Sequence, residues 1–179
     1  IPVTKQRVIP KNPYKVLDAP AFKTITLELG RLVQSERPCG RLIIFIYIWS
    51  ASSSKVTKLY DLGQNDTTTS VNWARNGSHL AVGTDTGLVQ VWDVACQKLV
   101  RVYHGHEGRV GALAWTNSVL SSGSKDRTIL NRDLRDKSEF ISKLSGHKQE
   151  VCGLKWSLDE QQLASGGNDN KLMVWSPQR

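Results

Sequence analysis

The spacing of the tryptophans constrains this chain more than any other feature. Trp73, Trp115 and Trp156 lie 42 and 41 residues apart, and each ends a short stretch of alternating apolar residues. A second set of positions keeps the same phase, with separations of 43, 40 and 43 residues: Trp49, Trp92, Arg132 and Trp175. A period near 40 residues is typical of arrays in which each repeat is one small structural unit. The sequence therefore predicts about four copies of one unit.

The residues around these tryptophans indicate what the unit is. Gly-His pairs stand at 105–106 and 146–147, and each His lies nine residues before a tryptophan of the first set. Trp92 and Arg132 are each followed by Asp. This is the Gly-His to Trp-Asp spacing of WD repeats, whose small sheets pack face to face around a central channel. The predicted fold class is all-β, an incomplete β-propeller of about four blades.

The alternating runs and the turn residues between them predict the boundaries. Residues 1–20 are expected to be an extended segment, 21–62 a degraded first blade, and 63–179 blades two to four, the last without its outer strand. In that last blade we expect strands at 150–156, 162–165 and 171–175, with turns at 157–161 and 166–170. The apolar run 42–49 is far shorter than the roughly 18 residues of a membrane span and is expected to be a buried strand.

A set of polar residues recurs within the unit and is expected to form a buried structural relay. Its members are His147, Ser165, Asp169 and Trp175 in the last repeat, and His106, Ser122 and Asp126 in the one before. An indole only donates and a carboxylate only accepts, so a hydroxyl and an imidazole between them complete the chain of hydrogen bonds. A Ser-His-Asp hydrolase triad is the alternative.

The relay residues occur in graded copies, which argues against a hydrolase. The third repeat carries Arg132 at the tryptophan position. The second repeat has Thr68 or Thr69 where Gly-His belongs and Thr86 where the aspartate belongs. Because a catalytic set is not expected in graded copies, we predict that the chain is not an enzyme.

Composition limits the remaining possibilities. Cys39, Cys96 and Cys152 are scattered singly, which indicates neither a disulfide framework nor a zinc site. The chain has no phosphate-binding or dinucleotide-binding glycine motif, so no cofactor is expected. The net charge of +8 favours acidic partners without choosing among them. Binding of nucleic acid is a weaker hypothesis, and a reducing location in nucleus and cytoplasm is expected.

Five blocks of sequence carry a more specific resemblance. They are IPKNPYKVLDAP at 9–20, GHEGRVGALAW, LSSGSKDRTIL, GHKQEVCGLKW and LASGGNDNKLMVW. In this order and spacing they resemble the Fizzy and Fizzy-related proteins, coactivators of the anaphase-promoting complex. The stretches WSASSSKVTKLYDLG and EFISKLSGHK are more similar to the plant Fizzy-related branch. The resemblance covers about residues 7–20 and 47–176.

The resemblance implies a substrate receptor for a ubiquitin ligase, with complex subunits and degron-bearing cell-cycle proteins as partners. Asn168 and Asn170 match asparagines that line the family's KEN-box site, although Asn-Asp-Asn also suits a turn. Trp49 and Val56 match part of the destruction-box groove, although ordinary blade packing is the alternative. Exposed backbone beside such a groove suits an extended peptide.

The family pattern is lost between residues 21 and 47. The aspartate strand that contacts the degron arginine in the family is missing there, as though an exon boundary had changed. The family's C-box, its Ile-Arg tail and three further blades are also not in the sequence, which opens on Ile1. Three hypotheses stay open: a coactivator relic that keeps KEN recognition, a WD-repeat scaffold or truncated product without degron specificity, and a nucleic-acid binder.

Overall fold

A computed structural model describes residues 23–30, 43–50, 56–61 and 66–176 of the 179-residue chain. The regular elements of these residues are strands, and no helix among them is long and apolar enough to cross a membrane. The first sheet contains β1 (Lys23–Gly30), β2 (Ile43–Ser50) and β3 (Val56–Asp61). The second contains β4 (Thr68–Trp73), β5 (His79–Thr84), β6 (Val89–Asp93) and β7 (Lys98–Tyr103).

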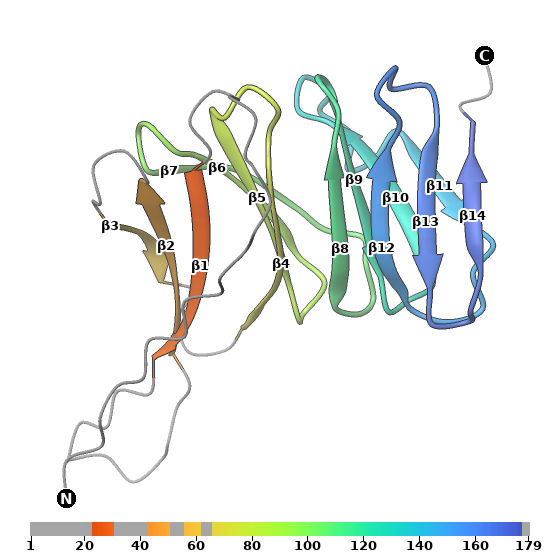
Figure 1. Ribbon diagram of the computed structural model, residues 1–179, viewed down its shortest axis with the longest axis horizontal. Coiled ribbons are helices and arrows are strands. Elements are labelled where there is room, and N and C mark those ends of the chain that lie inside the picture. The colour runs from red at the N-terminus through yellow and green to blue at the C-terminus, as the bar shows by residue number, and fades with distance from the viewer. Residues whose placement is uncertain (1–22, 31–42, 51–55, 62–65, 177–179) are drawn as a thin grey trace, which may run out of the picture.

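The last two sheets repeat this plan. The third contains β8 (Val110–Trp115), β9 (Val119–Ser124), β10 (Thr128–Asp133) and β11 (Ser142–Ser145). The fourth contains β12 (Val151–Trp156), β13 (Leu163–Gly167) and β14 (Leu172–Trp175). Within each sheet the strands follow chain order and pair antiparallel, and the sheets stand one after another (Figure 1). We call them blades one to four, and they confirm the predicted all-β, incomplete propeller.

The hairpins between the second and third strands of blades two to four share one turn. Gly87, Arg127 and Asn170 occupy the same place in it, with φ of 91°, 72° and 60°. Each of these amides donates to the carbonyl three residues earlier, at 3.3, 3.1 and 3.1 Å. Glycine and asparagine adopt this left-handed conformation at little cost. The left-handed conformation of the turn therefore explains Gly87 and Asn170 but not Arg127.

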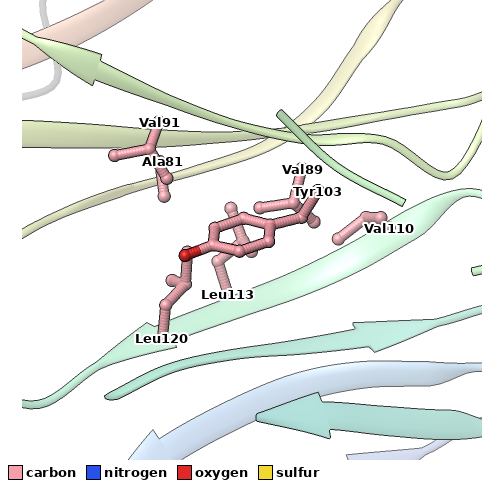
Figure 2. Close-up of a cluster of buried hydrophobic side chains, with 7 residues drawn as sticks. All are labelled: Ala81, Val89, Val91, Tyr103, Val110, Leu113 and Leu120. Atoms are coloured by element: carbon pink, nitrogen blue, oxygen red, sulfur yellow. The ribbon is translucent and has the colours of Figure 1, made fainter. Parts of the chain in front are cut away.

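The core lies between the blades. Figure 2 shows the cluster between blades two and three, where the Tyr103 ring lies among small and branched apolar side chains from both sheets. Blade two contributes Ala81, Val89, Val91 and Tyr103, and blade three contributes Val110, Leu113 and Leu120. Matching clusters join blade one to blade two and blade three to blade four. Blades two and three thus bury both faces against their neighbours, as repeat architectures require.

A glycine of one blade faces a valine of the next at two of these joints. A Cβ on Gly83 would lie 2.7 Å from Val110 Cγ1, and a Cβ on Gly123 would lie 2.5 Å from Val151 Cγ1. Both distances are far shorter than the spacing of carbon atoms in contact. The glycines therefore set how closely one blade approaches the next.

Two predictions about strands have clear outcomes. The apolar run 42–49 supplies β2, the central strand of blade one, with Ile46 and Ile48 buried, as predicted. The predicted end of the second strand of blade four at residue 165 is wrong, because β13 continues to Gly167. Gly166 still pairs across both neighbouring strands, so the turn begins later. The predicted extended segment 1–20 lies outside the described residues.

Candidate functional site

Blade four contains a hydrogen-bonded chain of four side chains. Trp175 Nε1 donates to Ser165 Oγ at 2.8 Å, and Ser165 Oγ lies 2.8 Å from His147 Nε2. The other ring nitrogen, Nδ1, lies 3.0 Å from Asp169 Oδ1. Since the indole can only donate, the serine hydroxyl donates to Nε2 and the imidazole carries its proton on Nδ1. Every polar atom in the chain then has a partner.

The carboxylate end of this relay also closes the β13–β14 turn. Asp169 accepts the backbone amides of Lys148 and Lys171 at 2.8 and 3.2 Å. The Lys148 amide, followed by the His147 ring, lowers the pKa of Asp169 to about 2. Asp169 is therefore ionised at neutral pH and ties the β11–β12 loop to the turn that follows β13.

Blade three keeps the relay but replaces the indole. His106 Nδ1 lies 2.8 Å from Asp126 Oδ2, and His106 Nε2 lies 2.8 Å from Ser122 Oγ. Arg132 Nη1 donates to the same hydroxyl. Burial alone would raise the pKa of Asp126, but hydrogen bonds from His106 and Thr128 outweigh it and hold the pKa well below the ordinary value.

Arg132 is fully buried, which is unusual for a cation, and among the described residues no carboxylate forms an ion pair with it. Its Nη2 donates to the His104 carbonyl at 2.9 Å and its Nε to the Glu139 carbonyl at 3.1 Å. Its guanidinium also lies 5.3 Å from the centre of the Tyr103 ring. Burial lowers the pKa of Arg132 to about 10, so the side chain stays charged at neutral pH. Arg132 thus replaces the indole as hydrogen-bond donor to Ser122 and also donates to the carbonyls of two loop residues.

The prediction for blade two is wrong in one position. Thr68 and Thr69 lie within β4, and the strand register places the equivalent of the histidine at position 64, outside the described residues; the contact to the turn residue Thr86 comes from Asp66. Asp66 Oδ2 accepts the Thr86 hydroxyl at 2.5 Å, and Asp66 Oδ1 accepts the Thr86 amide at 3.2 Å. The turn residue of blade two therefore donates to a carboxylate, whereas the turn residues Asp126 and Asp169 of the next two blades supply the carboxylate themselves. A search for Gly-His cannot find this arrangement because neither residue type is retained.

The burial of the relay decides what it can do chemically. The His147 side chain is 1% exposed, and Ser165 is exposed to the same extent. A nucleophilic serine must meet the substrate carbonyl, with its base in hydrogen-bond reach. Here the Ser165 oxygen already takes the Trp175 donor inside the blade. The geometry is that of a satisfied internal network, which rigidifies the blade.

The turn that the relay fixes presents two asparagines to solvent. Asn168 and Asn170 are exposed, and they flank the nearly buried Asp169. The Asn168 amide donates to the Glu150 carbonyl at 2.9 Å, and the Asn170 amide closes the turn onto Gly167. The structure therefore fixes the backbone amide of each asparagine. Asn170 also meets the left-handed conformation that the turn needs.

A charged hollow of about 380 Å³ lies on the same face. Its lining includes Asp85, Glu107, Arg109, Lys125 and Arg127, from the loops and turns of blades two and three. Arg109 reaches across to blade four, where Nε and Nη2 bind Glu150 Oε1 and Oε2 at 2.7 and 2.8 Å. The sequence reasoning missed this pair because the partners lie 41 residues apart in separate repeats. The shared repeat phase was the one signal that could have brought them together.

Trp49 and Val56 lie opposite each other at the end of the β2–β3 hairpin that adjoins the connection between the two strands. Their side chains fall outside the described part of the chain. The register places these two positions side by side at one end of blade one. They are far from the turn of blade four along the chain. Among the described residues, no group of three His, Cys, Asp or Glu side chains could hold a metal ion.

Comparisons with known proteins agree with this architecture. The family described as "WD domain, G-beta repeat" matches residues 138–176, and "Anaphase-promoting complex subunit 4 WD40 domain" matches residues 45–118. The chain is 55% identical over 98% of its length to the B-type cell cycle switch protein ccs52A of Medicago truncatula, and to Protein FIZZY-RELATED 2 of Arabidopsis thaliana. It spans 37% and 36% of their lengths.

A solved structure shows the same fold. A chain in the crystal structure of the mitotic checkpoint complex matches with a TM-score of 0.75 and 34% sequence identity. The match covers 100% of this chain and 58% of the other. The anaphase-promoting complex subunit cdc20 of Dictyostelium discoideum is 47% identical over 94% of this chain and is spanned over 34% of its length.

Proposed function

We propose that the chain recognises substrates for the anaphase-promoting complex. Over the part of these relatives that it spans, the chain belongs to the Fizzy and Fizzy-related family of WD-repeat proteins. In this proposal it binds degrons of cell-cycle proteins and catalyses no reaction itself. The observation that carries it is the turn of blade four, where two exposed asparagines stand on a backbone fixed by the buried relay. A rigid turn with exposed amides binds an extended peptide without the entropic cost of ordering a loop.

We assign KEN-type recognition to Asn168 and Asn170, whose side-chain amides both donate and accept hydrogen bonds. Destruction-box recognition is assigned to Trp49 and Val56, at the end of the β2–β3 hairpin. The partners proposed are complex subunits and degron-bearing proteins, and the proposed location is nucleus and cytoplasm. Fluorescence microscopy of the tagged chain tests the location.

A binding experiment must separate recognition by Asn170 from turn formation. Asn170→Gly removes the side chain and keeps the left-handed conformation, whereas Asn170→Ala also strains the turn. If the side chain recognises the degron, both variants weaken binding of a peptide containing Lys-Glu-Asn. If Asn170 serves only the turn, Asn170→Gly binds like the unaltered chain.

The same titration with Asn168→Ala completes the test. We expect a loss of roughly three- to tenfold in affinity, which corresponds to one hydrogen bond between peptide and protein. A peptide with the three residues replaced by alanine is the control. Equal binding of both peptides by the unaltered chain would defeat degron recognition and favour a scaffold without this specificity.

A further inference from the structure

Asn168 is exposed, yet the structure holds it at both ends. Its backbone amide donates to the Glu150 carbonyl at 2.9 Å. Its side-chain Oδ1 accepts from Cys152 Sγ at 2.8 Å. A side chain fixed in this way has little rotamer freedom left to lose when it binds a ligand.

The contact with Cys152 also decides which end of the amide is available. Oδ1 accepts from the thiol, whose Sγ also lies 3.5 Å from the Glu150 carbonyl oxygen, whereas the described residues provide no acceptor for Nδ2. The two Nδ2 hydrogens are therefore the groups offered to a ligand. Such a group recognises a hydrogen-bond acceptor, which in a peptide is a main-chain carbonyl or a carboxylate.

The Glu150 carbonyl is in turn held from the neighbouring blade. Arg109 binds both carboxylate oxygens of Glu150, and this contact lowers the pKa of Glu150. The Glu150 side chain is 11% exposed and that of Arg109 is 48% exposed, so the carboxylate is shielded while the arginine lies partly in water. A bidentate arginine–carboxylate contact also fixes geometry, not only charge. The position of Asn168 thus depends on contacts from both blade three and blade four.

We infer that Cys152 and the Arg109–Glu150 pair are positioning residues for peptide recognition at Asn168. Cys152 turns the amide so that its donors face the ligand, and the ion pair holds the loop that carries the Glu150 carbonyl. The ligand class is an extended peptide that offers a carbonyl or carboxylate oxygen to Nδ2. This inference rests on the function proposed above and names how its site is held.

The test uses the full chain with Cys39→Ser and Cys96→Ser, which leaves Cys152 as the one thiol. Titration with the Lys-Glu-Asn peptide compares Cys152→Ser, which keeps a donor, with Cys152→Ala, which removes it. We expect Cys152→Ala to weaken binding about three- to tenfold and Cys152→Ser to stay within about twofold, the range of one neutral hydrogen bond. Arg109→Ala is expected to weaken binding about two- to fivefold, and Ser145→Ala, at an exposed site in blade three, to leave it unchanged.

A second measurement reports on the contact itself. The rate at which a neutral maleimide labels Cys152 is expected to rise in Asn168→Ala, which loses the acceptor, and to fall when peptide is bound. Circular dichroism of each variant checks that it is folded. A variant that merely loosens the blade changes the spectrum, whereas loss of positioning changes peptide affinity and labelling alone.

The outcomes are distinct. If Asn168→Ala weakens binding while Cys152→Ala and Cys152→Ser bind equally well, the inference about Cys152 is wrong and the proposed function stands. If Arg109→Ala binds like the unaltered chain, the inference about the ion pair is wrong. If the unaltered chain does not distinguish the peptide from its alanine control, the proposed function fails and this inference fails with it.

Discussion

Removing the Ser165 hydroxyl tests whether the relay stabilises blade four. In Ser165→Ala the His147 Nε2 loses its donor and the Trp175 Nε1 loses its acceptor, both at 2.8 Å. His147 lies 1% exposed, so water cannot replace the lost partner there. A buried polar group without a partner costs about 1–3 kcal/mol. Trp175 is only half-buried, so the cost of its unpaired Nε1 lies at the low end of this range. We therefore expect the free energy of unfolding to fall by about 2–4 kcal/mol in total.

Equilibrium unfolding in urea measures this loss, with Ser145→Ala as the matched control. Ser145 is an exposed serine of β11 whose side chain has no hydrogen bond to any residue that the structure describes, so its substitution should change the stability by less than about 0.5 kcal/mol. Nitrogen NMR of the His147 ring adds a local readout, because the unaltered chain should carry its proton on Nδ1. A Ser165→Ala variant within about 1 kcal/mol of the unaltered chain would refute the argument that the relay is buried and satisfied.

Three further predictions concern other contacts. Gly167→Ala places a Cβ 2.6 Å from His147 Nδ1 and should destabilise by about 1–3 kcal/mol in thermal unfolding, whereas Gly166→Ala meets nothing within 4 Å and should be neutral or slightly stabilising. The pKa of Asp169 is lowered from 3.8 to about 2, so its ionised form stabilises the folded chain above about pH 4, and this stability is lost as the pH falls toward 2. In urea unfolding across this range, the free energy of unfolding should fall less steeply for Asp169→Asn than for the unaltered chain. Trp156→Phe removes the hydrogen bond to Ser121 Oγ in blade three and should lower the free energy of unfolding by about 1 kcal/mol. If its effect and that of Ser121→Ala are additive in a double-mutant cycle, the contact contributes nothing.

The sequence predicts the parts of the fold that repeat. The phase of the tryptophans and the Gly-His pairs is enough to place the four sheets, because each blade must bury the same positions against its neighbours. The relay of blade four follows from donor and acceptor counting alone. These features depend on contacts within one repeat, where spacing along the chain is informative.

Contacts that change chemistry or cross between repeats could not be found in this way. In blade two the turn residue is Thr86 and its carboxylate partner is Asp66, two residues after the position equivalent to the histidine, so no shared motif marks this contact. The Arg109–Glu150 pair joins two loops whose approach is set by blade packing, not by local sequence. The strand end at Gly167 was missed because a glycine pair resembles a turn, although here it keeps strand pairing.

The same glycine–valine contact recurs at two joints between blades. Gly83 receives Val110, and Gly123 receives Val151, at equivalent places in successive blades. In blade four the corresponding Gly166 has no atom within 4 Å of its would-be Cβ, so it can accept the same partner. A unit that begins its first strand with valine therefore meets the steric condition of this contact with any unit that carries the glycine. In an exchange of units the changes would be confined to the contacts particular to one joint, such as Arg109–Glu150 and Trp156–Ser121.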